Sequence, residues 1–419
     1  MRAIMNSASG NLIEWFDFYT YSFTSVYFAS QFFPSNGNTI EELLKAAGVF
    51  FIGFLMRPIG GWLFGYIADK YGRKIAMLLS IYMMCAGSFA IALLPTYQAI
   101  GIWAPLLLLI IRMFQGLSVG GEYGTVATYI SEVAQEGKRG FYGAFQYVTL
   151  IGGQLLASLS VFILTLILSE TELKAWGWRI PFFIGGLAAI VALFLRDSLH
   201  ESTSEKNLQK KEAGSLKDLL INHKKAFILV VCYTAGGSLT FYTYTTYMQK
   251  YLITTSGFDK STATLIMTSV LFVFMLMQPI FGLLADKIGT RKSLFAWSIL
   301  SIFCTMPLLK IIGHTQHAWT AFFCILVLMT IACLYTSIAG IIKAEMFPAY
   351  IRASGVGISY AIGNAMFGGS AEYIALWFKS LGIEQAFYYY ITFMMVIALI
   401  AVYLMPDAKK HSYLNKENT

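Results

Sequence analysis

Charged side chains inside long apolar stretches are the residues of this sequence that could do chemistry. An unpaired charge near the centre of a membrane-spanning helix costs at least about 2.5 kcal/mol, so each one is a candidate functional group. Arginine can hold a carboxylate through two parallel hydrogen bonds, and a buried carboxyl group can take up and release a proton. The candidates are Glu14, Asp17, Arg57, Arg112, Glu122 and Glu372. Ion pairs that only hold helices together are the competing interpretation.

The composition requires a lipid environment for the elements that carry these charges. Hydrophobic residues make up 57% of the 419 residues and charged residues 12%, and the mean hydropathy is +0.64. A soluble domain carries about 25% charged residues, so this chain has too little polar surface to dissolve in water. The composition therefore predicts an integral membrane protein and excludes a soluble enzyme.

About twelve apolar stretches are long enough to cross a hydrocarbon core of about 30 Å as α-helices. Glycine, proline and charged clusters separate them. They lie near 8–33, 43–68, 74–95, 103–133, 140–168, 180–197, 225–250, 262–285, 292–312, 318–344, 350–378 and 385–405. We therefore expect an all-α membrane protein with about twelve transmembrane helices.

A charged segment that occurs twice divides these stretches into two sets of six. Residues 65–74 read GYIADKYGRK and residues 282–292 read GLLADKIGTRK, with Thr290 where the first copy has Arg73. A repeat of this size in a membrane protein indicates two pseudo-symmetric halves that move against each other. We expect an N-terminal half at 1–197, a cytoplasmic linker at 198–225 and a C-terminal half at 226–419.

Lysine and arginine are concentrated in the segments that would lie on one side of the membrane. That side receives both charged segments, the linker and the C-terminal tail, whereas the other side receives Lys45, Lys174, Arg179 and Lys250. Positive residues accumulate on the cytoplasmic side, so we expect both termini in the cytoplasm. This asymmetry accounts for the net charge of +8 without a nucleic-acid partner. The first stretch continues as a full span, so we expect no cleavable signal peptide.

The linker at 198–225 is the only long polar segment in the interior of the chain. Within it, Leu216, Leu219, Leu220 and Ile221 are interspersed with charged residues. An amphipathic helix at the membrane surface and a plain solvated linker are both consistent with this pattern.

The residue spacing gives no support for a cofactor or a metal. The five cysteines fall in apolar stretches without the paired spacing of metal ligands. No glycine-rich turn is followed by the Lys-Ser or Lys-Thr of a nucleotide-binding loop. We expect no cofactor and no nucleotide hydrolysis.

Several motifs resemble those of the major facilitator superfamily, and within it those of the metabolite:proton symporters, over nearly the whole chain. The repeated charged segment is one of them, and Glu132 and Arg139 are mirrored by Glu345 and Arg352 at the same spacing. Other matching segments are RMFQG at 112–116, GNLIEWFDFY at 10–19, FQYVTLIGGQ at 145–154 and FYTYTTYMQK at 241–250. The last three resemble symporters that carry α-ketoglutarate.

The resemblance implies a twelve-helix protein of the bacterial inner membrane that exposes one central cavity to each side in turn. It implies import of α-ketoglutarate, or a similar dicarboxylate, together with protons, by a protein that functions as a monomer. A dianion in a low-dielectric cavity needs fixed cations, and Arg57 and Arg112 are the arginines within the membrane, with Lys343 a third candidate. The resemblance adds as uncharged contacts Gln154, Tyr147, Tyr242, Tyr244 and Asn364. Aromatic packing is the alternative interpretation of the tyrosines.

Asp17 is the expected proton carrier. At a rise of about 1.5 Å per residue it lies about halfway along its helix, and Arg112 lies about a third of the way along its own, so the two could meet inside the bundle. We expect Asp17 to pair with Arg112 when ionised and to free the guanidinium when protonated, as the resemblance to sugar:proton symporters also implies. Glu14 and Glu122 are the alternative carriers.

Charged residues at the cytoplasmic face are expected to hold the two halves closed there. The two aspartates of the repeated segments would contact nearby helix ends, and the other residues would form charge pairs. The set comprises Asp69, Arg73, Lys74, Glu132, Arg139, Asp286, Arg291, Glu345 and Arg352. A purely topological role for the basic residues is the alternative.

Three other functions remain open from the sequence. The chain could be a proton symporter for another metabolite, such as shikimate, citrate, proline or betaine. It could be a facilitator without proton coupling. A membrane receptor or osmosensor is the third, although no sensory domain or long coiled coil is recognisable.

Overall fold

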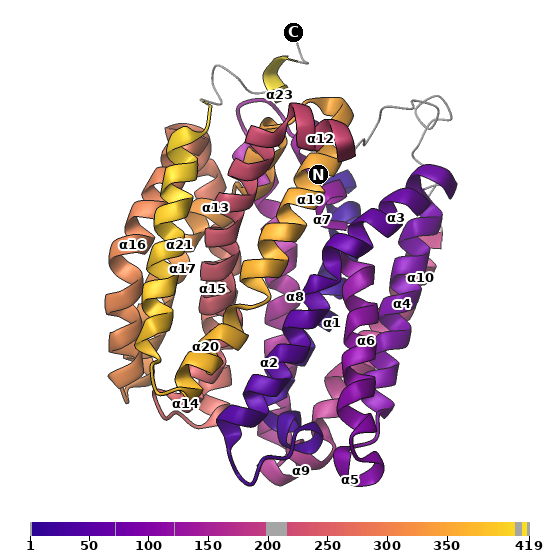
Figure 1. The fold of residues 1–419 in the computed structure, drawn as a ribbon, viewed down its shortest axis with the longest axis vertical. Coiled ribbons are helices and arrows are strands. Elements are labelled where there is room, and N and C mark those ends of the chain that lie inside the picture. The colour runs from indigo at the N-terminus through magenta and orange to yellow at the C-terminus, as the bar shows by residue number, and fades with distance from the viewer. Residues whose placement is uncertain (1, 72, 121, 198–215, 407–412, 417–419) are drawn as a thin grey trace.

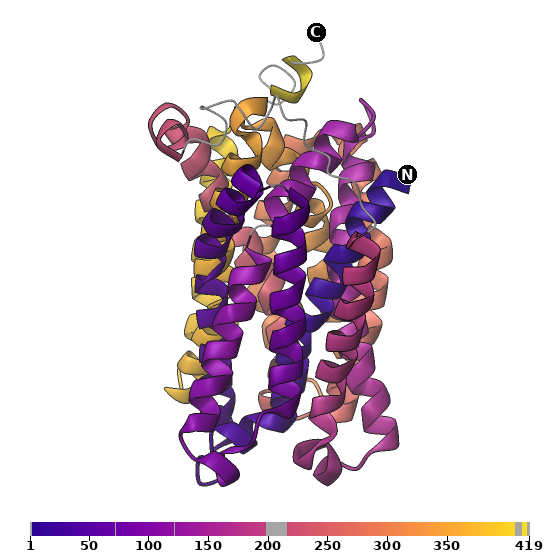
Figure 2. The same ribbon diagram turned by 90° about the vertical axis from the view of Figure 1, so that its right-hand side faces the viewer.

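The computed structural model describes residues 2–71, 73–120, 122–197, 216–406 and 413–416. Within them it leaves out the side chains of residues 2–10, 65–71, 73–77, 122, 125–126, 129, 132–133, 192–197, 349–350, 353 and 415–416. The described residues form helices and contain no strand. The long helices run side by side (Figure 1). Figure 2 shows the two ends of the chain at the same end of the bundle.

The N-terminal half contains eight helices of twelve or more described residues. They are α1 (Arg2–Phe32), α2 (Thr39–Leu55), α3 (Arg57–Tyr71), α4 (Arg73–Leu93), α6 (Trp103–Val119), α7 (Glu122–Val133), α8 (Arg139–Ile167) and α10 (Ile180–Asp197). Short helices join them at the end of the bundle opposite the termini (Figure 1). These are α5 (Tyr97–Ile100), α9 (Glu170–Ala175) and the 3-10 helix η1 (Gly177–Arg179).

The C-terminal half repeats this arrangement with more interruptions. Its helices are α13 (Lys224–Tyr242), η2 (Thr243–Tyr247), α14 (Met248–Thr254), α15 (Lys260–Ile288), α16 (Thr290–His314), α17 (Ala318–Thr336), α18 (Ala339–Glu345), α19 (Ala349–Gly363), η3 (Asn364–Gly368), α20 (Ala371–Ser380) and α21 (Gln385–Leu404). The short helices α12 (Leu216–Asn222) and α23 (Tyr413–Lys416) lie at the end of the bundle that holds the termini.

The predicted all-α membrane fold is confirmed, and each predicted stretch coincides with a helix or a set of consecutive helices. Among the described residues, seven helices are long and apolar enough to cross a membrane, and Leu78–Leu93, Trp103–Val119 and Gly177–Val191 are shorter apolar helices. The helix α1 and the run from α19 to α20 occupy the two remaining predicted stretches. The apolar runs thus predicted the helices well because the lipid solvent imposes their length.

Two turns of π-helix interrupt the C-terminal half. The segment η2 lies between α13 and α14, and η3 lies between α19 and α20. The helices α1 and α8 of the other half carry no such interruption. Apolar periodicity does not predict a π turn, which adds a residue to the helical ladder and occurs often at functional sites.

The two halves pack closely where α8 crosses α15. A Cβ atom on Gly140 would collide with the backbone oxygen of Gly282, and a Cβ on Gly282 would collide with Gly140. Gly282 is the first residue of the second charged segment. At the other end of that segment, Gly289 has a φ of 96°, which favours glycine, and joins α15 to α16. The segment is therefore held against the N-terminal half.

Within the linker, residues Leu216–Asn222 form a short helix, which agrees with the first of the two interpretations left open by the sequence. In α12, Leu219 is buried, whereas Leu216, Leu220 and Ile221 are exposed. Residues 198–215 of the predicted linker lie outside the described residues, and its last two residues, Lys224 and Lys225, begin α13.

Candidate functional site

Arg57 stands at a helix break in the N-terminal half. The helix α2 ends at Leu55 and α3 begins with Arg57, whose side chain is buried. Its guanidinium carbon lies 3.8 Å from the ring centre of Phe54, 4.4 Å from that of Phe18 and 5.0 Å from that of Trp15. These ring faces attract a cation and replace part of its hydration. Its Nε and Nη2 atoms have no hydrogen-bond partner among the described residues.

Arg112 on α6 shares one of these rings. Its guanidinium carbon lies 4.6 Å from the ring centre of Phe18 and 4.5 Å from that of Tyr21. Its Nη1 atom donates to Gln115 Oε1 at 2.9 Å, whereas Nε and Nη2 have no partner in the described part of the chain. Two buried cations next to one ring, each with unused donors, form a site suited to an anion.

Asp17 and Arg112 are connected through Gln115. Gln115 Nε2 donates to Asp17 Oδ2 at 3.1 Å, and Ser88 Oγ on α4 donates to the same oxygen. The two groups lie within electrostatic range of each other, but no salt bridge joins these two described side chains, so in this conformation the Gln115 amide stands between them. The other oxygen, Asp17 Oδ1, has no hydrogen-bond partner among the residues described. The carboxyl group is thus linked to the guanidinium through one amide.

Gln115 and Ser88 were missed by the sequence interpretation. Gln115 follows Arg112 by three residues, so both lie on one face of α6, and this spacing was the available signal. Ser88 gave no signal because its role depends on how α4 packs. Of the alternative proton carriers, Glu14 is buried on α1, and the Glu122 side chain lies outside the described residues.

Three of the uncharged residues predicted to contact the substrate lie at the boundary between the halves. Gln154 Nε2 on α8 donates to Thr246 Oγ1 of η2 at 3.4 Å. Tyr242 accepts a hydrogen bond from the hydroxyl of Tyr19 at 3.2 Å. The ring centre of Tyr147 lies 5.8 Å from that of Phe241.

The other two residues predicted to contact the substrate, Asn364 and Tyr244, differ in their distance from the boundary between the halves. Asn364 in η3 is buried, and both of its side-chain polar atoms lack hydrogen-bond partners among the described residues. A Cβ atom on Gly368 would meet both Asn364 Oδ1 and the Tyr242 ring, so Asn364 lies beside the tyrosine pair. Tyr244 is instead hydrogen-bonded to Thr305 of α16 at 2.6 Å, within the C-terminal half, and the structure does not bring it to the arginines.

One predicted contact at the end of the bundle that holds the termini is present. Asp286 accepts hydrogen bonds from the backbone N–H groups of Gly140 at 2.7 Å and Phe141 at 3.0 Å. These groups lie in the first turn of α8, so a carboxylate of the C-terminal half caps a helix of the N-terminal half. The expectation that Asp286 contacts a helix end is met.

The other predicted gate residues have different partners. Arg291 donates to the Tyr403 carbonyl at 2.7 Å, and Arg352 donates to the carbonyls of Ala344 and Phe347, so these bonds stay within the C-terminal half. Arg139 donates to the Leu414 carbonyl of α23 at 3.3 Å. Glu345 lies close enough to Arg139 for an electrostatic interaction across the halves. The side chains of Asp69, Arg73, Lys74 and Glu132 lie outside the described residues.

A buried ion pair links the halves towards the opposite end. Lys250 Nζ on α14 lies 3.3 Å from Glu372 Oε2 on α20, and it donates to the Ser22 hydroxyl of α1 at 2.6 Å. Ser22 in turn donates to Glu372 at 3.2 Å. The count of positive residues placed Lys250 on the outer side. The structure places it in α14, at the end of the bundle opposite the termini, with its side chain fully buried. The role of this pair was not predicted.

Comparison with known families accounts for both halves of the chain. The family described as "Sugar (and other) transporter" matches residues 3–217, and the family described as "Major Facilitator Superfamily" matches residues 226–419. The chain belongs to the major facilitator superfamily. It is an integral membrane transporter and not an enzyme.

Named members of the superfamily are similar over almost the whole length. The sequence is 58% identical to the alpha-ketoglutarate permease of Escherichia coli strain K12, over 95% of this chain and 92% of that protein. It is 32% identical to the proline/betaine transporter of Salmonella typhimurium strain LT2, over 96% of this chain and 82% of that protein.

The fold also matches solved structures of the superfamily. A partially occluded inward-open conformation of the xylose transporter of E. coli superposes with a TM-score of 0.77, covering 97% of this chain and 98% of that one. The identity is 16%, so this likeness concerns the fold alone.

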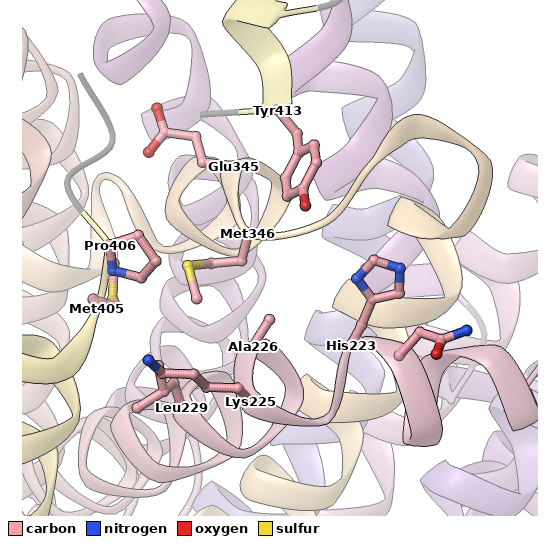
Figure 3. Close-up of a pocket in the computed structure, with 10 residues that line it drawn as sticks. His223, Lys225, Ala226, Leu229, Glu345, Met346, Met405, Pro406 and Tyr413 are labelled. Carbon is pink, nitrogen blue, oxygen red and sulfur yellow. The ribbon is translucent and has the colours of Figure 1, made fainter. Parts of the chain in front are cut away.

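A pocket of about 220 Å³ opens at the end of this superfamily member where the termini lie (Figure 3). Its wall is formed by the start of α13, the end of α18, the residues after α21 and Tyr413. Of the predicted site residues it contains Glu345 alone, so the arginines do not line it. The candidate site is therefore the buried group around Arg57 and Arg112.

Proposed function

We propose that the chain imports α-ketoglutarate, or a similar dicarboxylate, together with protons by alternating access. The observation that supports this most is the pair of buried guanidinium groups of Arg57 and Arg112 beside Phe18, with unused N–H donors on both. A carboxylate supplies the acceptors that these donors lack, and its charge offsets the cost of two buried cations. The alpha-ketoglutarate permease of E. coli, which is 58% identical, favours the same substrate.

Asp17 is the proposed site of proton binding. In its ionised form it accepts from Gln115, which orients the amide oxygen towards Arg112. Protonation of Asp17 removes the charge that holds this amide, and the amide can then turn and release the guanidinium to the substrate. Proton and substrate binding are coupled because both act on the Arg112 side chain.

Closing contacts at both ends give alternating access its two gates. The Asp286 cap on α8 closes the end that holds the termini, which we place in the cytoplasm. The pair of Lys250 and Glu372, together with Ser22, closes the other end. Each contact joins the two halves, so opening one end requires one of them to break.

The proposed setting is the bacterial inner membrane, with both termini in the cytoplasm. The N-terminal half at 1–197 and the C-terminal half at 226–419 would move about the central site, with 198–225 as linker. A monomer contains all the groups named above, so neither a second copy nor a nucleic-acid partner is needed.

Transport by the purified protein in liposomes tests the proposal. Labelled α-ketoglutarate should exchange against internal α-ketoglutarate with or without a protonophore. Its accumulation under an inside-alkaline pH gradient should disappear when the protonophore is added. Exchange without gradient-driven accumulation would identify an uncoupled facilitator. Exchange of shikimate, citrate, proline or betaine, but not of α-ketoglutarate, would identify another substrate.

A further inference from the structure

Lys343 is a buried cation of the C-terminal half that lies inside a group of tyrosines. Its Nζ atom donates to the hydroxyls of Tyr123 and Tyr335 at 3.2 Å each and to the Ala339 carbonyl at 3.0 Å. The group, which we name the tyrosine box, consists of the rings whose centres lie 5.1 to 5.9 Å from Nζ: Tyr123, Tyr233, Tyr335 and Tyr360.

The charge of Lys343 has no counterion among the described residues. Its hydrogen-bond acceptors are two hydroxyls and one carbonyl, all of them neutral, and it takes part in none of the salt bridges found there. A buried ammonium group without a carboxylate favours the binding of an anion. The hydroxyl of Tyr233 is buried and also lacks a hydrogen-bond partner in the described part of the chain. The box therefore holds both a cation and a free donor.

The tyrosine box is closed by contact between the two halves. Tyr123 belongs to α7, whereas the other three tyrosines belong to the C-terminal half. The Tyr123 ring stacks on that of Tyr360 with centres 3.3 Å apart and planes 8° from parallel. A ligand group that enters the box must therefore arrive where the halves meet.

The box is continuous with the proposed substrate site. Tyr360 lies within electrostatic range of both Arg57 and Tyr242, and Tyr147 lies beside Tyr123. Tyr242 is in turn packed against Phe54, the ring nearest to Arg57, with centres 5.2 Å apart. Polar tyrosines thus form a band from the arginines of one half to Lys343 of the other.

We propose that Lys343 binds the second carboxylate of the substrate, with the hydroxyls of the tyrosine box as additional donors. This inference rests on the proposed function, in which Arg57 and Arg112 bind the first carboxylate. A ligand with a carboxylate at each end contacts cations of both halves and stabilises the closed arrangement between them. A monocarboxylate has a single charged group, so it contacts the cations of one half only. Lys343 therefore determines the preference for dicarboxylates and couples that preference to closure of the halves.

The test compares binding of α-ketoglutarate with that of 2-oxopentanoate, which has the same chain length and lacks the second carboxylate. The protein is purified and titrated calorimetrically with each compound. We expect Lys343→Met to weaken α-ketoglutarate binding by about tenfold or more and to leave 2-oxopentanoate binding within about twofold, because one charged contact is lost. Lys343→Arg should retain part of the preference. Lys310→Met removes an exposed lysine of α16 and serves as the matched control, without effect on either ligand.

The outcomes separate this inference from the proposed function. If wild-type protein binds no dicarboxylate, both are wrong. If wild-type protein prefers α-ketoglutarate and Lys343→Met keeps the same ratio of affinities, the inference alone is wrong. The inference is also wrong if Lys343→Met binds neither ligand although it has the elution volume and melting temperature of the wild type. In that case the lysine does not distinguish the second carboxylate from the first.

Discussion

At the scale of single residues, the Phe18 ring is shared by the two arginines of the proposed anion site. Its ring centre lies 4.4 Å from the guanidinium carbon of Arg57 and 4.6 Å from that of Arg112. The ring attracts both cations, yet it offers no hydrogen bonds, so their donors remain available. The aromatic neighbours of the arginines thus stabilise two like charges near each other, as the proposed anion site requires.

Because the N–H donors of Arg57 have a fixed planar geometry, we expect even its replacement by lysine to weaken substrate binding strongly. Arg57→Lys keeps the charge and loses the planar fork that holds a carboxylate, so the affinity for α-ketoglutarate should fall roughly 10- to 100-fold. Concentration-dependent uptake in proteoliposomes measures this. Unchanged affinity in the lysine variant would show that charge alone, without the paired hydrogen bonds, is recognised.

Asp17 should control coupling without being needed for exchange. Asp17→Asn cannot release a proton, so substrate accumulation under a pH gradient should be lost, whereas exchange between equal substrate pools should continue. Ser88→Ala removes a neutral donor to the same carboxyl group and serves as the comparison, with coupling retained. Gradient-driven uptake that persists in Asp17→Asn would move the proton to another acid, such as Glu14.

Sequence reasoning located the charged residues of the site but not the links between them. Arg57, Arg112 and Asp17 stand out because charge is costly in lipid. Gln115 and Ser88 are uncharged, and their roles depend on how α4 and α6 pack against α1. The burial of Lys250 was not predicted, because its partners Glu372 and Ser22 lie on other helices and meet it only through packing.

At the scale of elements, the junction of α8 and α15 combines close packing with a helix cap. The Asp286 carboxylate accepts from two N–H groups in the first turn of α8, next to the close approach of Gly140 and Gly282. The partial positive charge of the helix N-terminus favours an ionised group there. In the proposed transport cycle, this cap breaks when that end opens.

Asp286→Asn should shift the protein towards an open state at this end. The amide is a weaker acceptor for the α8 N–H groups, so labels at Glu136 and Lys292 should move apart on average in electron–electron distance measurements. Asp259→Asn is the matched control, because Asp259 caps α15 within its own half. Equal distance distributions in wild type and Asp286→Asn would show that the cap does not hold the gate.

A second contact between elements, the ion pair of Glu170 with Lys260, is predicted to stay intact across the physiological pH range. Glu170 on α9 accepts from Lys260 of α15 at 2.8 Å and from Lys174 at 3.0 Å, and these hydrogen bonds lower the pKa of Glu170 to about 2. Because the pKa is depressed, the contact is complete above the ordinary carboxyl pKa of 4.5 and is lost as pH falls through about 2. The distance between labels on α9 and α15 should stay constant from roughly pH 8 to pH 5. A change within that interval would show that another group controls this contact.

The elements themselves were largely predictable, and their interruptions were not. Each apolar stretch became a helix because backbone groups in lipid must bond within their own segment. The π turns at Thr243–Tyr247 and Asn364–Gly368 also bond their backbone groups within the segment, but from residue i to i+5 instead of i to i+4. Hydropathy therefore does not distinguish them from α-helix.

At the scale of the whole molecule, contacts between the halves are present at both ends in this structure. Asp286 joins them at one end, and Lys250 with Ser22 joins them at the other. In this structure the contacts of both proposed gates are therefore intact. The repeat in the sequence predicted two moving halves, but the outer contact has no counterpart in the repeated charged segment.

Loss of the buried outer pair should favour opening at that end. Glu372→Gln leaves Lys250 buried without its counterion, so water should enter and labels at Lys45 and Ser380 should separate. Distance measurements between these positions check the result, and transport should slow because the outer end no longer closes firmly. Glu384→Gln removes a partner of Lys379 within the C-terminal half and is the matched control. A closed outer end in Glu372→Gln would exclude the pair as a gate.

The two π turns distinguish two helical runs of the C-terminal half from α1 and α8 of the N-terminal half. Both lie in the C-terminal half, whereas α1 and α8 continue without interruption. The position of a π turn can shift along a helix. The side chains that it passes then rotate about the helix axis, while the two helix ends stay in place. We therefore expect α13–α14 and α19–α20 to rotate more readily than α1 and α8, so that the side chains of Thr246 and Asn364 change direction while the helix ends stay in place.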